Sequence, residues 1–211
     1  MGLIQNKIVQ QDCLLGTWEI TRDFNRLLRC TTLSKEELLT LHGFKNYNRK
    51  LEYLSVRALL NEMAGEQARI IYDSTNKPYL QDGSHQISIS HSHQLTSILL
   101  SKKKRTGIDL EYMSHRISKI ADRFIHPDEK VTSDPKKKRS HLYIHWCAKE
   151  ALYKICDKNL LNFRENLYIE PFEIADQGFL TGWVLTGNRE ESFDMYYYFM
   201  DNYIIVYCCK E

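Results

Sequence analysis

Two acidic residues near the middle of the chain have a spacing that suits the binding of a cation. In the hexapeptide TGIDLE, residues 106–111, polar and apolar residues alternate, which predicts a β-strand. Asp109 and Glu111 then lie on one face, while Ile108 and Leu110 point from the other face into a core. Two carboxylates side by side repel each other, and a bound divalent cation removes that repulsion. Mg²⁺ binds a few carboxylates together with water and substrate phosphates, so we expect Asp109 and Glu111 to be metal ligands.

A second stretch, about forty residues later, offers a third carboxylate. Residues 146–154, WCAKEALYK, are rich in helix-forming residues, and neither Gly nor Pro interrupts residues 141–157. At four-residue steps, Trp146, Glu150 and Lys154 lie along one face of the predicted helix. If this helix brings Glu150 to the strand, the site has three carboxylates, with Lys154 one turn away to neutralise phosphate charge. The alternative is an ordinary Glu–Lys pair on a solvated helix face.

The two stretches together resemble the paired signature of the 4′-phosphopantetheinyl transferases, GIDLE at residues 107–111 followed by W-x-x-K-E-A-x-x-K at residues 146–154. The pentapeptide is common by chance, whereas the helix pattern is much more specific. The resemblance implies the larger, single-chain, surfactin-synthetase-activating type. Its fold is α+β, a pseudo-dimer of two similar α/β halves with the active site in the cleft between them. Here the halves would be residues 1–105, on the side of the coenzyme A adenine and 3′-phosphate, and residues 106–211, with the metal-binding acids and the catalytic helix.

The activity implied by the resemblance is that of a magnesium-dependent holo-[acyl-carrier-protein] synthase. It moves 4′-phosphopantetheine from coenzyme A to a serine of an apo acyl or peptidyl carrier protein, and adenosine 3′,5′-bisphosphate leaves. Asp109, Glu111 and Glu150 would hold Mg²⁺. Glu150, directly or through a metal-bound water, would be the catalytic base, and Lys154 would bind and neutralise the pyrophosphate. The partners would be coenzyme A and an acidic carrier protein, and a chain of fused halves implies a monomer.

Three further stretches match the coenzyme A contacts of the family. In SISHS, residues 88–92, Ser90 and His91 match a Ser-His-Ser that contacts phosphates, although Ser88 stands where the family usually has Asn. Without the resemblance these side chains would simply cap a turn. Lys77, in KPY at residues 77–79, matches a Gly-Lys-Pro loop beside the adenine. Asn76 replaces the Gly there, and Asn also adopts positive φ.

Basic residues of one predicted helix form the third match. Arg57, in VRALL at residues 56–60, matches the arginine that holds the coenzyme 3′-phosphate, or is an ordinary surface arginine. Arg49 and Lys50 lie two turns earlier and are weaker candidates for the same phosphate. Phe124 and Glu129 also fit a recurring family pattern, and we assign Phe124 to the core and a catalytic role to neither.

The overall composition sets the class of protein. An apolar fraction of 43% and a charged fraction of 27% are those of a soluble globular chain, and a net charge of +2 gives no global field for nucleic acid. The six Cys show no C-x-x-C spacing, which predicts reduced thiols. The sequence has neither a signal-peptide pattern nor an apolar run long enough for a membrane span, so we expect a cytoplasmic protein.

Two alternatives remain open at this point. The basic runs at residues 102–105 and 136–139, both KKKR, are solvated turns or a surface for an acidic partner. With the aromatic C-terminal strands they would suit a non-catalytic module that binds an acidic protein or single-stranded nucleic acid. His141 and His145, at i,i+4, with His91 and His93 would suit a zinc hydrolase, but no H-E-x-x-H surrounds the pair.

The same periodicities predict the elements that position these residues. Ser34 and Glu37 form a capping box, which marks the start of a helix. The order of elements is strand, helices, strands in each half, which is typical of an α+β protein, although no residue-level repeat links the halves. We expect helices at residues 23–29, 35–41, 46–63, 117–125 and 141–157, a polar loop at 128–139, and strands at 13–20, 69–72, 85–90, 95–100, 106–111, 172–174, 179–185, 193–200 and 203–208.

Overall fold

The computed structural model describes residues 2–10, 12–156, 161–187 and 189–211. Asp157, the last residue of the predicted catalytic helix, lies outside these ranges. The chain divides into two compact units, residues 1–103 and 104–211, and each unit has its own antiparallel sheet and its own hydrophobic core. The fold is therefore mixed α and β.

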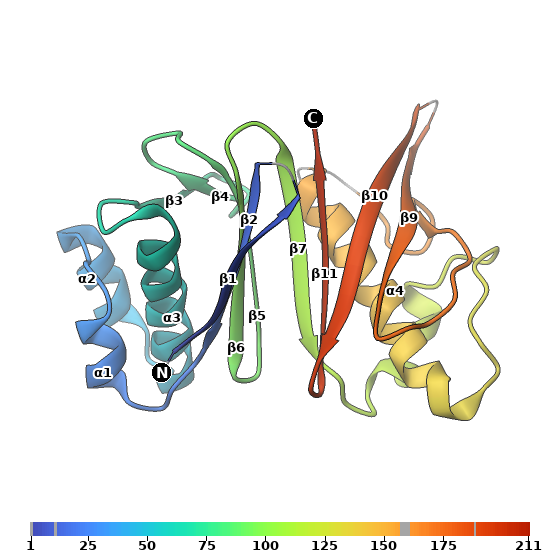
Figure 1. The fold of residues 1–211 in the computed structure, drawn as a ribbon, viewed down its shortest axis with the longest axis horizontal. Helices are drawn as coiled ribbons and strands as arrows, with labels where there is room; N and C mark the ends of the chain where they lie inside the picture. The colour runs from blue at the N-terminus through green and yellow to red at the C-terminus, as the bar shows by residue number, and fades with distance from the viewer. Residues whose placement is uncertain (1, 11, 157–160, 188) are drawn as a thin grey trace. The chain divides into compact units, whose positions relative to one another are not determined.

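The first unit is a four-stranded antiparallel sheet with one long helix against it. The strand order is β1 (Leu3–Gln10), β2 (Cys13–Glu19), β6 (Leu95–Ser101) and β5 (Gln86–Ser92). Helix α3 (Tyr47–Ala64) packs against β2 and β6, and α1 (Phe24–Arg29) packs against α3 (Figure 1). Helix α2 (Lys35–Gly43) begins at the predicted capping box of Ser34 and Glu37, which is confirmed. A small hairpin of β3 (Ile70–Tyr72) and β4 (Pro78–Leu80) completes the unit.

The second unit is a five-stranded antiparallel sheet, also with one long helix against it. The strand order is β7 (Arg105–Tyr112), β11 (Tyr203–Lys210), β10 (Arg189–Met200), β9 (Gln177–Thr186) and β8 (Leu167–Ile169). Helix α4 (Pro135–Ile155) packs against β7 and β11, as Figure 1 shows. The Asp134 side chain caps its first turn, and Pro135 is tolerated there because the first turn needs no donor from that residue. The two 3₁₀ turns η1 (Ile117–Lys119) and η2 (Ala121–Arg123) lie between β7 and α4.

Several predictions about elements were wrong or incomplete. The helix expected at residues 117–125 is the two 3₁₀ turns, which are interrupted at Ile120. The strand expected at 172–174 is absent, because Pro171 cannot donate to a sheet ladder, and β8 ends before it. Strand β1 was missed because its side chains are mostly exposed and show no alternation, and β4 and β8 were missed because three residues are too few for a periodic signal. Helix α4 begins within the stretch expected to be a loop, because Lys-rich turns can be helical once Asp134 and Pro135 start them.

Two further facts concern the cysteines and the described helices. The six cysteines are all free thiols. Among the described helices, none is both long and apolar enough to cross a membrane.

The absence of a side chain at Gly107 lets β7 and α4 approach each other closely. A Cβ built at this position would lie 2.2 Å from the backbone oxygen of Ala151 on α4, and 3.1 Å from Cβ of Ile155. A backbone atom cannot move aside as the end of a side chain can, so only glycine fits without a shift of the helix. Gly107 therefore fixes how near the helix lies to the strand that carries Asp109 and Glu111.

We predict that Gly107→Ala destabilises the protein by about 1–3 kcal/mol, the usual cost of overpacking a tightly packed contact. Urea unfolding followed by circular dichroism measures the change. Gly43→Ala is the control, because a Cβ there meets nothing within 4 Å, and it should shift stability by less than about 0.5 kcal/mol. Equal stability of Gly107→Ala and the wild type would mean that the strand–helix contact is not tight in solution.

Candidate functional site

The two acidic residues of β7 lie on the face of the sheet that α4 covers. Asp109 is opposite Val206 and Glu111 is opposite Ile204 on β11, and directly opposed residues of antiparallel strands project to the same face. Val206 and Ile204 belong to the core cluster that α4 packs on. Asp109 is only 4% exposed. The predictions that the acids share a face and that Ile108 and Leu110 are buried are confirmed, and α4 covers the acid-bearing face as well.

Lys154 of α4 contacts this strand directly. Its Nζ donates to Oδ1 of Asp109 at 2.7 Å and to the backbone oxygen of Ile108 at 2.9 Å. The lysine side chain is 20% exposed and the aspartate side chain 6%. A half-buried ammonium thus lies against the buried carboxylate, and helix and strand are joined by a charge-assisted hydrogen bond.

Glu150 belongs to the same stripe of α4 as the residues that face the acids. Cys147, Glu150 and Lys154 are spaced i, i+3 and i+7, which places them in one row along the helix. Burial raises the pKa of the Cys147 thiol well above its ordinary value, and the carboxylates of Asp109 and Glu111 raise it further. Since both ends of the row lie near Asp109, the row that carries Glu150 runs along the acid-bearing strand. Glu150 itself is half-buried.

The chemistry of this donor set fits a hard divalent cation, although the conformation described is not a finished metal site. Among the residues that the structure describes, no three His, Cys, Asp or Glu side chains form a group that could hold a metal ion. The oxygen-only character of Asp109, Glu111 and Glu150 still matches the preference of Mg²⁺. In this conformation the Lys154 ammonium supplies the positive charge next to Asp109. These three carboxylates are the residues that would hold the ion.

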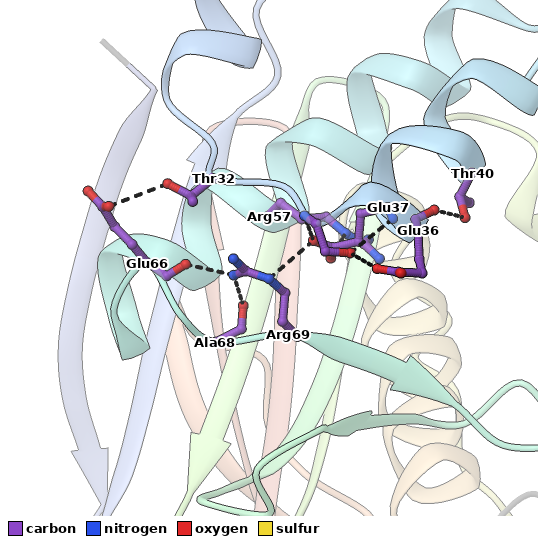
Figure 2. A network of polar contacts seen from close by, with 9 residues as sticks. Thr32, Glu36, Glu37, Thr40, Arg57, Glu66, Ala68 and Arg69 are labelled. Carbon is purple, nitrogen blue, oxygen red and sulfur yellow. Dashed lines mark hydrogen bonds and ion pairs between the residues drawn. The ribbon is translucent and has the colours of Figure 1, made fainter.

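In the first unit, the predicted phosphate arginine is buried in a polar network. Arg57 is 4% exposed, and its Nε donates to Oε1 of Glu37 at 3.2 Å. Arg69 approaches the other oxygen of Glu37 at 3.6 Å, and Figure 2 shows the two arginines converging on this carboxylate. The Arg57 guanidinium also lies 3.5 Å from the ring centroid of Tyr53. These contacts give Arg57 a structural role, while its contact with the coenzyme stays a prediction.

Arg49, a weaker candidate for binding the coenzyme phosphate, lies beside His91. Its Nη1 is 3.0 Å from Nε2 of His91 and 3.0 Å from Oε2 of Glu52. The arginine side chain is 49% exposed and the histidine 36%, so both reach solvent. The pairing across α3 and β5 was not visible in the sequence, where the two residues are 42 positions apart. Ser90, the neighbour of His91, is buried on β5.

The loop that contains Lys77 is held rigidly by one aspartate. Oδ1 of Asp73 accepts from the backbone nitrogens of Thr75 and Lys77 at 2.8 and 2.9 Å, and from the Thr75 hydroxyl. Asn76 has φ of 62°, so it adopts the positive φ that was expected when it replaced glycine. Nζ of Lys77 lies 5.5 Å from the ring centroid of Tyr79. The turn therefore keeps a fixed backbone and leaves an ammonium beside an exposed aromatic ring.

Comparison with known proteins gives two matches. Residues 105–208 match the family model of the 4′-phosphopantetheinyl transferase superfamily. This segment places the chain in the 4′-phosphopantetheinyl transferase superfamily. A curated relative, the 4′-phosphopantetheinyl transferase HetI of Nostoc sp. (strain PCC 7120 / SAG 25.82 / UTEX 2576), is 26% identical over 171 residues. The match covers 73% of this chain and 72% of the relative.

In this transferase-family chain, the first lysine of the helix signature has a different environment from the second. Lys149 is fully buried, and its Nζ lies 2.9 Å from Oε2 of Glu129 and donates to the backbone oxygens of Phe124 and Phe163. Glu129 in turn accepts from the backbone nitrogens of His126 and Ile169, each at 2.7 Å. This ion pair and its hydrogen bonds thus join α4 to β8 and to the two connecting segments before and after α4. Lys149 belongs to the scaffold that holds Glu150 in place.

In the buried pair of Lys149 and Glu129, each charge stabilises the charged form of the other. Burial lowers the pKa of Lys149 to about 8, and the attraction of Glu129 opposes the shift. Burial alone would raise the pKa of Glu129, but the contacts with His145 and Lys149 outweigh it, so the pKa of that carboxyl is lowered. Glu129 was part of a recurring pattern in the sequence, but its pairing with a lysine twenty positions away was not predictable. Phe124, predicted as core, is fully buried.

The histidines considered for zinc are packed as aromatic rings. His141 and His145 are buried on α4, with ring centroids 4.9 Å apart, and Phe172 lies against both. Nδ1 of His141 accepts from the backbone nitrogen of Thr132 at 3.0 Å, and burial lowers the pKa of His141 to about 4. The ring is therefore neutral near pH 7 and carries its proton on Nε2. These contacts are those of a packed interior and supply no metal group among the described residues.

We predict that Lys149→Met destabilises the second unit by about 3–5 kcal/mol, because it leaves the Glu129 carboxylate buried without its cation. Urea unfolding followed by tryptophan fluorescence suits the test, since Trp146 stacks on Phe163 with ring centroids 5.5 Å apart. Lys130→Met is the control, because Lys130 is exposed and should change stability by less than about 0.5 kcal/mol. A loss below about 1 kcal/mol in Lys149→Met would contradict the structural role.

Proposed function

We propose that this chain transfers the 4′-phosphopantetheine group of coenzyme A to a serine hydroxyl of an apo acyl or peptidyl carrier protein. The observation that carries the proposal is the junction of α4 and β7, where Lys154 contacts Asp109 and the row of Cys147, Glu150 and Lys154 follows the acid-bearing strand. A lysine and three carboxylates at one junction suit a reaction at a pyrophosphate. Membership of the transferase superfamily supports the same class of reaction.

In the proposed reaction, the serine oxygen forms a bond to the phosphorus that carries the pantetheine arm. The bond from that phosphorus to the bridging oxygen breaks, and adenosine 3′,5′-bisphosphate leaves with the bond's electron pair. The serine proton goes to the Glu150 carboxylate, directly or through a water molecule. Asp109, Glu111 and Glu150 would hold Mg²⁺, which when bound neutralises charge on the pyrophosphate oxygens. Most of the rate enhancement then comes from positioning and electrostatics, as in phosphoryl transfer generally.

Lys154 has two partners in this proposal. In the conformation described, its ammonium balances the Asp109 carboxylate. Its side chain is partly exposed, so it can also meet a phosphate that enters from solvent. We assign Lys154 to the pyrophosphate and to the leaving group, while Lys149, which is buried with Glu129, has no direct contact with substrate.

The coenzyme contacts that we propose lie in the first unit. Arg49 lies against His91 and both are partly exposed, so the Arg49 guanidinium suits a terminal phosphate, and Ser90 precedes His91 on β5. Lys77, in its rigid loop, is assigned to the adenine side. Arg57 remains a candidate for binding the 3′-phosphate, as the family pattern suggests. Its burial with Glu37 supports a second role, in holding α2, α3 and the segment of Arg69 together.

The exposed lysines at the start of α4 suit the acidic partner. Lys136, Lys137 and Lys138 lie in its first turns and reach solvent. Carrier proteins are acidic, and opposite charges across a forming interface speed association. This surface is part of the proposed contact with the carrier protein.

We predict that Glu150→Gln and Asp109→Ala each lower the rate at least about a hundredfold, the scale seen when a preorganised charge-stabilising group is removed. The protein is incubated with coenzyme A, Mg²⁺ and an apo carrier protein, and the mass gain of the carrier is followed. Omission of Mg²⁺, with a chelator present, should abolish transfer in the wild type. Glu165→Gln, an exposed acid of the same unit, is the control and should leave the rate unchanged. A fully active Glu150→Gln would exclude this residue from both proposed roles.

We also predict that Arg49→Ala raises the KM for coenzyme A about tenfold or more with little loss of stability, because Arg49 is exposed and its neighbours are solvated. Arg57→Ala should instead lower stability by about 3 kcal/mol or more, because it leaves Glu37 without its closest cation. Steady-state kinetics with coenzyme A and with its 3′-dephospho form separates an effect on binding of the 3′-phosphate from an effect on stability. An Arg49→Ala variant that discriminates between the two coenzymes as well as the wild type does would show that Arg49 does not bind the 3′-phosphate.

A further inference from the structure

A cavity in the first unit is separate from all the residues assigned to coenzyme A and the carrier protein. Its volume of about 390 Å³ is in the range of small-molecule sites. It lies where the β1–β2 edge of the sheet meets α1 and the last turn of α3. Its walls are formed by Gly2, Leu3, Trp18, Thr21, Arg26, Leu27, Cys30 and Glu62.

Two polar side chains of this cavity are buried without a hydrogen-bond partner among the described residues. They are the indole Nε1 of Trp18 and the hydroxyl Oγ1 of Thr21. Trp18 is 5% exposed, and the backbone of Gly2 covers its ring so closely that a Cβ there would lie 2.2 Å from it. A buried N–H or O–H without an acceptor is costly. A ligand that offers an acceptor to both groups would therefore gain free energy that a purely apolar ligand would not.

The charged residues at the mouth of the cavity indicate which class of ligand it suits. Arg26 on α1 and Glu62 on α3 are both exposed and both line the cavity. Two donors and a guanidinium together suit a carboxylate, which accepts several hydrogen bonds. Glu62 disfavours a second negative charge. Leu3, Leu27 and the indole ring of Trp18 offer an apolar wall to the body of the ligand.

The position of the cavity within the sheet separates it from the coenzyme residues. Trp18 lies on β2, and Leu3 on the edge strand β1. His91 lies on β5, the opposite edge of the same four-stranded sheet. Three strand spacings separate the two edges, roughly 14 Å. A ligand in this cavity would not contact the Arg49–His91 pair.

We propose that this cavity binds a small organic monocarboxylate with a flat apolar body. The carboxylate accepts from the Thr21 hydroxyl and the Trp18 indole and pairs with Arg26, and the body lies between Leu3, Leu27 and the indole ring. Both donors are buried, so binding requires that the Thr21 hydroxyl turn toward the cavity and that Gly2 move off the indole N–H, which breaks the hydrogen bond from the Glu19 backbone nitrogen to the Gly2 oxygen. The site is independent of the transferase reaction.

The test uses benzoate as the probe and the full chain as the protein. We expect 10 mM benzoate to raise the Tm, because a ligand that binds only the folded state stabilises it by mass action. Benzamide has the same shape without the charge, and phthalate has a second charge, so both should give a smaller shift at the same concentration. Saturation-transfer NMR should show the aromatic protons of benzoate in contact with the protein, and coenzyme A should not displace them.

Three variants test the assigned groups. Thr21→Val and Arg26→Ala should each weaken benzoate binding about tenfold, the effect of one hydrogen bond or ion pair to a charged ligand. Arg29→Ala, on the same helix but outside the cavity, is the matched control and should bind as the wild type does. Because Thr21→Val and Arg26→Ala alter small or exposed side chains, circular dichroism should show them folded.

Several results would overturn the proposal. The first is the absence of any Tm shift with benzoate. The second is equal binding by Arg26→Ala, Thr21→Val and the wild type. The third is displacement of benzoate by coenzyme A, which would assign the binding to the coenzyme site.

Discussion

The close contact between α4 and β7 at Gly107 is the constraint on which the candidate site depends. Because Gly107 has no side chain, the helix backbone can lie against the strand at Ala151. Three residues along the helix, Lys154 then reaches Asp109, two residues along the strand. A one-residue slip of β7 would turn both acids to the other face of the sheet, away from the helix. The register of β7 against β11 and the size of residue 107 therefore fix the chemistry together.

The two lysines of the helix signature have different roles in that contact. They are five positions apart, so their side chains leave the helix about 140° from each other. Lys149 is fully buried and tied to Glu129 and two backbone oxygens, and this fixes α4 against the segments on one side. Lys154 is partly exposed and reaches the acid-bearing strand on the other side. Glu150 lies between them in the sequence, next to the buried lysine and one turn before the partly exposed one.

Local patterns predicted most of the elements of this chain but not which sequence-distant side chains meet. The alternation of residues 106–111 predicted the strand, and Ser34 with Glu37 predicted a helix start, because both signals are local. Alternation says that Asp109 and Glu111 share a face, but not that this face is the one under the helix, which depends on pairing with β11 almost a hundred residues later. The pairing of Arg57 with Glu37 and of Lys149 with Glu129 also joins residues twenty positions apart. In the sequence Arg57 was therefore either a phosphate contact or a surface arginine, and Lys149 was simply the residue next to the predicted catalytic Glu150.

The charge at the junction of α4 and β7 bears on what the site can hold. Asp109, Glu111 and Glu150 contribute three negative charges, and Lys154 contributes one positive charge. Asp109 is almost completely buried, and the Lys154 ammonium lies against its carboxylate. Burying like charges is costly unless a counter-charge approaches them, so a stable fold alone does not explain why acids rather than apolar residues face the helix here. In the reaction that we propose, a divalent cation beside Asp109 would replace the Lys154 ammonium and free it for a phosphate, which is the exchange that a reaction at a pyrophosphate needs.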